Sequence, residues 1–247
     1  MQAFARETRQ SETTFVQSSD SGADYRCRIW MTRHELPFAG HPSLGTAVAV
    51  ALARGDTKAS YVQETRAGLQ PIDVEVVDER RARTSMLQEP ATFGPELAPE
   101  EVLRAAGVDA AHAHPELPVQ VVHTGVPQIL APVRAEALRD LRPDFPLLEA
   151  LIVEHDAATL YLAAIDGARV RARSLYVDPQ AVSEDPATGS AVGPLMAYLH
   201  ERRGLERLHV EQGGEMGRPS VLRCSVEGDR VRVGGDTVVV ARGTVTL

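Results

Sequence analysis

Residues 35–47 read Glu-Leu-Pro-Phe-Ala-Gly-His-Pro-Ser-Leu-Gly-Thr-Ala, and this stretch carries the strongest signals for the fold and for the site. An apolar turn leads to Gly40, and the Ala and Leu residues that follow predict a buried helix over Pro42–Ala53, which Gly55 ends. The first N–H groups of a helix lack partners within the helix and carry a partial positive charge. The pattern therefore predicts an anion-binding helix start, although small residues in this position also serve as ordinary caps.

The same pattern occurs a second time in the chain. Residues 184–191 read Glu-Asp-Pro-Ala-Thr-Gly-Ser-Ala and open a predicted apolar helix over Ala191–Leu199, which Gly204 ends. Gly189 follows Gly40 by 149 residues, about one domain length. With strand-like segments in both halves, the sequence predicts an α+β protein with a duplicated fold, in which the two helix starts face each other.

A Pro-rich passage over Glu89–Pro99 reads as a loop and places the domain boundary near residues 95–118. We accordingly assign an N-terminal domain to residues 1–104 and a C-terminal domain to residues 105–239. Near the C-terminus we expect a hairpin turn at Gly234-Gly235-Asp236, and a last strand over residues 240–247 that packs with the N-terminal domain.

An acidic residue precedes each of the two helices. Glu35 is followed by Leu, Pro and Phe, so we expect its carboxylate to be partly buried by Phe38. Removal from water raises the pKa of a glutamate towards neutrality, which suits a group that must accept and return a proton. Asp185 lies four residues before Gly189. The alternative for both acids is a capping or solvated role, because negative charge is favoured near a helix start.

Composition excludes several classes of function. The net charge is -8 and the basic residues form no run, which argues against nucleic acid and against an anionic membrane surface as partners. The longest apolar stretch, Thr46–Ala53, is far shorter than the ~20 residues that span a bilayer. Since no basic and apolar leader precedes it, we expect a cytoplasmic protein.

Metal and cofactor motifs do not occur in the sequence. The eight His residues show no metal-ligand spacing, and no Gly-x-Gly-x-x-Gly run is found, so we expect neither a metal nor an organic cofactor. The two Cys residues, Cys27 and Cys224, stand in alternating segments that read as strands, where Cys behaves as a small apolar side chain.

Both acidic stretches closely resemble the two signature segments of the phenazine-biosynthesis (PhzF-like) family of isomerases and epimerases. Shorter motifs resemble the family in its usual order, so the resemblance covers essentially the whole chain: Arg6-Glu-Thr with Ser11-Glu-Thr-Thr-Phe-Val, Thr124-Gly, Gln212-Gly and Gly217-Arg-Pro-Ser. The resemblance implies a diaminopimelate-epimerase-like fold. Such a fold has two pseudo-symmetric domains, each a curled, mostly antiparallel sheet around a central helix. It also implies an active site in the cleft between them, and a homodimer.

The resemblance further implies a cofactor-independent isomerase or epimerase of a small carboxylic acid. In the phenazine enzyme of the family, the residue that matches Glu35 shuttles a proton during isomerisation of a dihydro-hydroxyanthranilate. The residues that match Asp185 and Ser190 contribute to the substrate pocket of that enzyme. By the same comparison, anion-binding backbone groups come from Gly40, His41, Thr188, Gly189 and Ser190.

Two features depart from the family pattern. The usual first strand, Gly-Asn-Pro turn and helix start have no counterpart in this sequence. The active-site His that follows the catalytic Glu of the phenazine enzyme is also missing: Glu64 or a neighbour stands at that point, and no His occurs between His41 and His112. We therefore expect a different small amino or hydroxy carboxylic acid as the substrate.

Two other functions were compared with this one. Thiol-based racemases of the wider fold need a Cys at each helix entrance, and this chain has Gly40-His-Pro and Thr188-Gly-Ser there, so that mechanism is excluded by residue type. A non-catalytic small-molecule-binding protein that uses the same cleft stays open as the alternative.

Overall fold

The computed structural model describes residues 1–178 and 181–245. The chain folds into two compact units, one made of Met1–Leu87 with Gly234–Leu247 and the other of Gln88–Val233. These limits differ from the sequence-based boundaries at 104 and 239. The reason is strand pairing: the passage expected to be a loop contains strand β7 (Thr92–Leu97), which pairs with β8 (Val119–His123) of the second unit.

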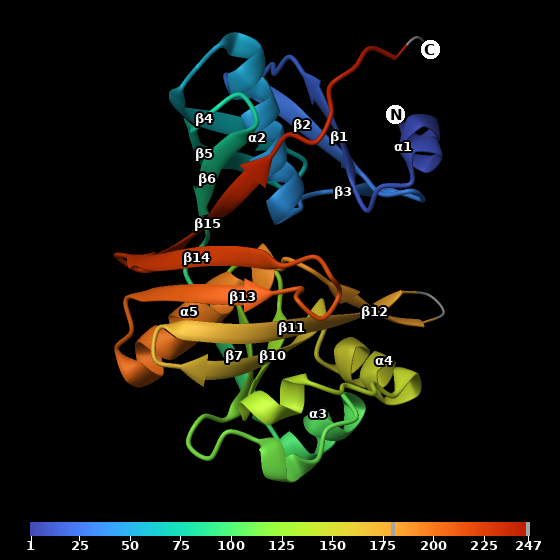
Figure 1. The fold of residues 1–247 in the computed structure, drawn as a ribbon, viewed down its shortest axis with the longest axis vertical. Coiled ribbons are helices and arrows are strands. Elements are labelled where there is room, and N and C mark those ends of the chain that lie inside the picture. The colour runs from blue at the N-terminus through green and yellow to red at the C-terminus, as the bar shows by residue number, and fades with distance from the viewer. Residues whose placement is uncertain (179–180, 246–247) are drawn as a thin grey trace. The chain divides into compact units, whose positions relative to one another are not determined.

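The first unit is a curled, mostly antiparallel sheet packed against helix α2 (Gly40–Arg54), as Figure 1 shows. Its strand order is β1-β2-β4-β5-β6, followed by the end of β15; β2 and β4 are parallel, and the short β3 returns antiparallel along β2. The elements are α1 (Gln2–Thr8), β1 (Thr13–Gln17), β2 (Tyr25–Trp30), β3 (Glu35–Leu36), β4 (Lys58–Thr65), β5 (Gly68–Val76), β6 (Arg81–Leu87) and β15 (Arg230–Val238). The predicted helix over Pro42–Ala53 is thus confirmed.

The end of the chain differs from the expected hairpin and last strand. Strand β15 runs straight through Gly234, where a side chain would collide with the backbone oxygen of Thr84 and with Ser85 on β6. Gly234 therefore allows β15 and β6 to approach each other closely, and it does not form a turn. Residues 240–245 form no strand, and residues 246 and 247 lie outside the described part of the chain.

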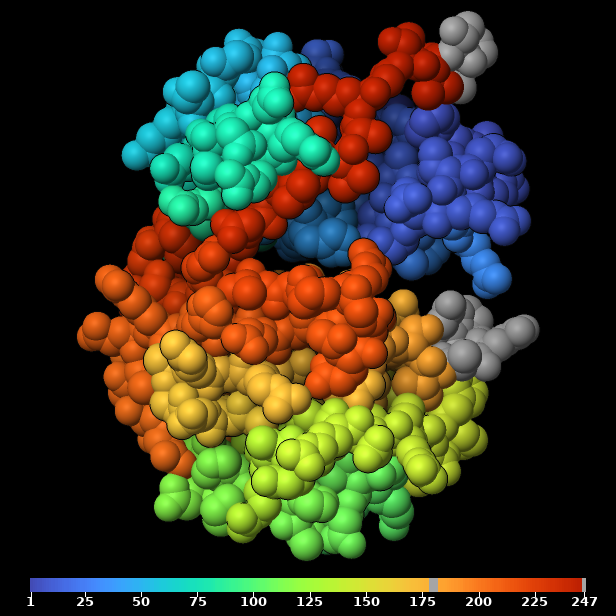
Figure 2. All heavy atoms as spheres, viewed as in Figure 1, coloured from blue at the N-terminus to red at the C-terminus, as the bar shows by residue number. Residues whose placement is uncertain are grey.

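The second unit is a sheet covered by helices on both faces. Its strand order is β7-β8-β9-β10-β11-β13-β14-β15, and β12 pairs with β11. The elements are α3 (Pro99–Ala105), β9 (Gln128–Val133), α4 (Phe145–Glu154), β10 (Thr159–Asp166), β11 (Arg169–Asp178), β12 (Ala181–Asp185), α5 (Gly189–Arg203), β13 (Arg207–Gln212) and β14 (Ser220–Glu227), with short 3₁₀ helices at Ala110–His112 and Ala135–Leu138. Figure 2 shows the orange residues of β13 and β14 lying beside the gold residues of β11.

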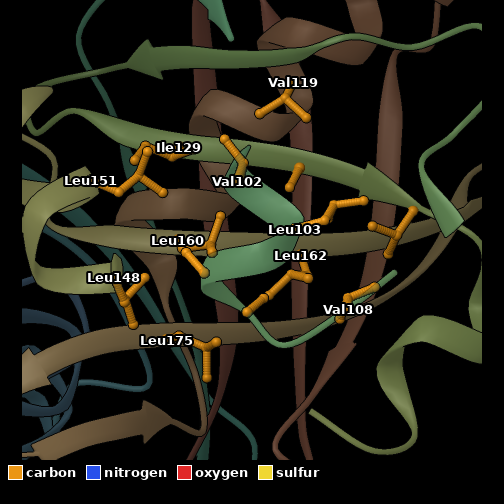
Figure 3. Packing of buried hydrophobic residues seen from close by; sticks show 14 of the residues in the cluster. Val102, Leu103, Val108, Val119, Ile129, Leu148, Leu151, Leu160, Leu162 and Leu175 are labelled. Atoms are coloured by element: carbon orange, nitrogen blue, oxygen red, sulfur yellow. The ribbon is translucent and has the colours of Figure 1, made fainter. Parts of the chain in front are cut away.

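Alternating residues of these strands build two cores. One core joins α3 and α4 to one face of the sheet; Figure 3 shows Leu103 and Leu148 packing towards Leu160 and Leu162 of β10. The other core surrounds α5 and contains Tyr161, the residue between these two leucines. Successive residues of a strand point to opposite faces, which explains why one strand serves both cores.

The two units repeat one arrangement of elements. In the first, β2 is followed by an antiparallel return strand β3, helix α2 and a parallel strand β4; in the second, β11, β12, α5 and β13 follow in the same order with the same pairings. Helices α2 and α5 are both 15 residues long, and each ends at a glycine with positive φ. The predicted duplication is confirmed at the level of topology.

Candidate active site

Both helix starts singled out in the sequence are present in the structure. Helix α2 begins at Gly40 after Ala39, and α5 begins at Gly189 after Thr188. In the part of the chain that the structure describes, neither Ala39 nor Thr188 caps its helix with a side-chain hydrogen bond. The first backbone N–H groups of each helix are therefore not claimed by a capping side chain, which is the state required for anion binding.

Glu35 lies on β3, directly opposite Trp30 of β2, and its side chain is only 8% exposed. Arg28 donates two hydrogen bonds to the carboxylate, from Nε to Oε1 at 2.7 Å and from Nη2 to Oε2 at 2.8 Å. Arg66 adds a longer contact of 3.4 Å from Nη1 to Oε2. Two parallel bonds from one guanidinium fix the orientation of the carboxylate as well as its charge.

The pKa of Glu35 is shifted in the direction opposite to the one expected from its apolar neighbours. Hydrogen bonds from Arg28 lower the pKa of Glu35; burial acts in the other direction, and the charges of Arg28 and Arg66 lower the pKa further. The expectation of a raised pKa is therefore wrong for this structure. Phe38 packs against the core around α2, and the arginines dominate the setting of the carboxylate.

His41, in the first turn of α2, is turned towards the N-terminal segment. Its Nε2 lies 3.0 Å from Oε2 of Glu12. Burial raises the pKa of Glu12, but His41, through a hydrogen bond and its charge, and a hydrogen bond from Ser11 together lower it below its usual value. Sequence reasoning gave Glu12 no role at the site. The available signal was the Ser11-Glu-Thr motif.

The second acidic segment forms a closed polar network at the start of α5. Thr188 donates from Oγ1 to Oδ2 of Asp185 at 2.6 Å, so the carboxylate holds the loop that enters the helix. Gln212 donates to the backbone oxygen of Asp185 and to Oγ1 of Thr188, and accepts from the Thr188 N–H and from the Tyr161 hydroxyl. The structure thus brings Asp185, Thr188, Gly189 and the half-buried Ser190 together. The role of Gln212 was missed, although its motif was noticed.

An arginine–glutamate pair occupies the same place in both repeats. Glu35 faces Trp30, two residues after Arg28; Glu184 faces Leu175, two residues after Arg173. Arg173 binds Glu184 through Nε and Nη2 at 2.9 and 2.6 Å, and donates from Nη1 to the backbone oxygen of Leu138. Both partners of this second pair are only 13% exposed. The ion pair between Arg28 and Glu35 is therefore one copy of a structural feature that both units contain.

The family follows from comparison with known proteins. The chain matches the family of phenazine biosynthesis-like proteins (PhzC-PhzF) over residues 1–243. The chain belongs to this family. It is 36% identical to a trans-2,3-dihydro-3-hydroxyanthranilate isomerase of Pseudomonas fluorescens, over 100% of this chain and 88% of the relative's length. The corresponding enzyme of Pseudomonas chlororaphis is 35% identical over the same shares of the two chains. The protein is accordingly an isomerase of the PhzF-like family.

Solved structures agree with this family and with the fold class. A predicted epimerase of Pseudomonas aeruginosa superposes with a TM-score of 0.84 at 34% identity, covering 100% of this chain and 88% of its own. A PhzF-family protein of Bacillus anthracis gives 0.82 at 25% identity, covering 97% and 86%. A hydroxyproline epimerase of Agrobacterium vitis, at 14% identity and a TM-score of 0.59, shares the fold alone. The diaminopimelate-epimerase-like class predicted from the sequence is confirmed.

Glu64 and its neighbours occupy the position expected to replace the active-site His of the phenazine enzyme. Glu64 accepts bonds from Arg26 and also from Ser19 and Ser21, so it is committed to another cluster. Its neighbour Arg66 is the residue that reaches Glu35. In this member of the PhzF-like family, a permanent cation therefore lies close to the proposed acid/base.

The described residues offer neither a metal site nor a membrane-spanning helix. No group of three or more His, Cys, Asp or Glu within residues 1–178 and 181–245 is placed to hold a metal ion. Among the described helices, none is long and apolar enough to cross a membrane. Cys27 and Cys224 are buried free thiols, and burial raises the pKa of Cys27 to about 11 and that of Cys224 to about 12. Both are poor nucleophiles, in keeping with the packing role expected from the sequence.

Proposed function

We propose that this isomerase moves a proton between carbon atoms of a small carboxylic acid without a cofactor, and that Glu35 is the acid/base residue. The observation that carries the proposal is the geometry of Glu35: a nearly buried carboxylate, held in one orientation by Arg28, five residues before the uncapped start of α2. A general base needs a fixed position near the hydrogen that it removes.

The remaining site residues bind the substrate in this proposal. Backbone N–H groups at the starts of α2 (Gly40, His41) and α5 (Gly189, Ser190) bind the substrate's carboxylate, because helix starts favour negative charge. Thr188, whose N–H donates to Gln212, shapes the loop that leads into α5. Asp185 holds the loop at the start of α5 in shape and faces a polar group of the substrate. That one ligand contacts both helix starts is a prediction from the family resemblance and from the duplicated pattern.

The proton step follows from the charge state of Glu35. Because Arg28 lowers the pKa of Glu35, the side chain is ionised at neutral pH and ready to accept a proton. It takes a proton from one carbon, the electron pair stays on the substrate as an enolate-like anion, and the same carboxyl group returns the proton to another carbon on the same face. A carboxylate shared by two guanidinium groups is a weak base, so the reaction requires one of these contacts to loosen.

A second candidate is a non-catalytic binding protein that uses the same helix starts. The observation in its favour is the repeated arginine–glutamate pair. Arg173 pairs with Glu184 in the same strand register, and Glu184 has no role in the proposed chemistry. Under this alternative, the pair between Arg28 and Glu35 likewise serves only to stabilise the fold. Under this alternative, ligands bind but no proton moves.

Solvent exchange separates the two candidates. The protein is incubated in D₂O with trans-2,3-dihydro-3-hydroxyanthranilate, the compound for which the relatives are named, and with a panel of small amino and hydroxy carboxylic acids. Mass spectrometry then detects deuterium bound to carbon. The isomerase proposal predicts incorporation into at least one compound that also stabilises the protein in a thermal shift assay. Compounds that bind without any exchange throughout the panel would support the binding protein instead.

A further inference from the structure

Two positively charged side chains converge on one carboxylate at Glu35. Arg28 provides the two short bonds, and Arg66 approaches the same Oε2 atom at 3.4 Å. Hydrogen bonds and charge from Arg28, together with Arg66, lower the pKa of Glu35 against the opposing effect of burial. The cluster therefore carries one positive charge more than it needs to neutralise Glu35, and an additional anion is electrostatically favoured there.

The second repeat shows that Arg66 is not needed to build the cluster. Glu184 is held by Arg173 in the same strand register as Glu35 by Arg28. Among the described residues, Arg173 is the one cation that pairs with Glu184. Since the repeated pair folds without a third member, the structural role of Glu35 is complete with Arg28 alone.

The backbone of Arg66 is fixed while its side chain is exposed. Arg66 and Ala67 form the tight turn between β4 and β5, where Thr65 donates from Oγ1 to the backbone oxygen of Gly68. The Ala67 N–H donates to the Pro37 oxygen in the segment that connects β3 to α2. The turn is thus tied to the loop that carries the proposed site, yet 63% of the Arg66 side chain is exposed.

The contact between Arg66 and Glu35 is weak enough to exchange. An exposed ion pair contributes ~0–1 kcal/mol, and a 3.4 Å contact lies at the long end of hydrogen bonding. One N–H of the guanidinium approaches Glu35, whereas the group has five donors in a planar fork that matches a carboxylate. A ligand carboxylate can therefore accept two parallel hydrogen bonds from Arg66, whereas Glu35 accepts one.

We propose that Arg66 is a substrate-recognition residue that joins the helix-start N–H groups in binding the carboxylate of the incoming ligand and leaves Glu35 as it does so. The assignment rests on the proposed function for the location of the site, and it adds one named contact to that site. It also supplies the loosening step that the chemistry requires. Once Arg66 turns to the ligand, Glu35 loses a cation and gains a nearby anion, so its basicity rises only when a substrate is bound.

Binding of benzoate to the isotope-labelled full chain, followed by NMR, tests the contact. Benzoate should shift the Arg66 and Ala67 amide signals with a saturable dependence, whereas the neutral analogue benzyl alcohol should not. Arg66→Gln should weaken benzoate binding roughly tenfold or more, because a charge-assisted pair is lost. Arg81→Gln is the matched control: Arg81 is 66% exposed, is the first residue of β6 and pairs with Asp78, and its loss should leave the affinity unchanged.

The carboxyl carbon signal of Glu35 provides a second readout. In the unmodified protein, saturating benzoate should raise the pKa of Glu35, and in Arg66→Gln it should not. The proposal is overturned if no saturable benzoate binding occurs, if Arg66→Gln and Arg81→Gln bind benzoate equally well, or if benzoate leaves the pKa of Glu35 unchanged. None of these readouts requires turnover. Benzoate binding through Arg66 together with absent deuterium exchange would contradict the proposed function and leave this assignment standing.

Discussion

Glu35 and Glu64 both lie in the first unit, and hydrogen bonds from an arginine lower the pKa of each carboxyl group. The sequence identified Glu35 from the residues that follow it, but its partner Arg28 stands seven positions earlier on another strand. That contact depends on the pairing of β2 with β3, which places Arg28 close to Glu35 across the hairpin. Hydrophobic pattern alone does not predict such pairing, which is why the direction of the pKa shift was wrong.

The pH dependence of stability tests the ion pair of Glu64. Hydrogen bonds from Arg26 and Ser19 lower the pKa of Glu64 from 4.5 to about 2. A lowered pKa in the folded state stabilises the protein above the unfolded value and loses this effect as the pH falls to about 2. The Glu64→Gln variant should therefore be less stable than the unmodified protein at neutral pH, and the gap should close between pH 4.5 and about 2. Urea denaturation across this pH range measures the difference in stability between the two proteins. A difference that does not depend on pH would contradict the lowered pKa of Glu64.

At the scale of elements, long periodic segments were predictable and short or irregular ones were not. Both central helices were confirmed, because their apolar composition and terminal glycines are local signals. Strand β7 was missed because Pro95 reads as a breaker; the strand tolerates it at the edge of the sheet, beside an irregular register. The return strand β3 has only two residues, and the sequence Ala-Val-Ser-Glu-Asp of β12 does not alternate, yet these strands position Glu35 and Glu184.

Glycines in the two central helices should respond oppositely to substitution by alanine. Gly45 of α2 has open space around it, so Gly45→Ala should raise stability by about 0.5–1 kcal/mol through helix propensity. In α5, a side chain at Gly193 would collide with Gln88, which binds both Gly189 and Thr124. Gly193→Ala should therefore lower stability by about 1–3 kcal/mol. Chemical denaturation measures both, and equal effects at the two positions would show that the environment of Gly193 is wrongly described.

At the scale of the whole molecule, duplication and family were predictable because two long motifs recur 149 residues apart, from Gly40 to Gly189. The limits of the two compact units were not, because β15 contributes residues to both: Arg230–Val233 to the second unit, and the rest of the strand, from Gly234, to the first. A strand that serves two units leaves no composition change at the boundary, and local pattern therefore placed the C-terminal limit at 239, whereas the second unit ends at Val233.

We also expect a homodimer, on the strength of the family resemblance. Light scattering at micromolar concentration should then give twice the chain mass of 26.7 kDa. A mass of one chain under these conditions would contradict the expectation. The test is independent of the site, since no residue of the proposed chemistry is assigned to a partner subunit.

The central claim is that Glu35 transfers the proton. The most direct measurement is the turnover of Glu35→Gln in the exchange assay, on a compound that the unmodified protein processes, with ligand affinity measured in parallel. The variant should bind the ligand but lose turnover by at least ~100-fold, because it keeps the shape of the side chain and removes the base. Glu64→Gln, which removes another arginine-bound carboxylate from the same unit, should retain near-native turnover. Near-native turnover and solvent exchange in Glu35→Gln would show that Glu35 is only a structural partner of Arg28.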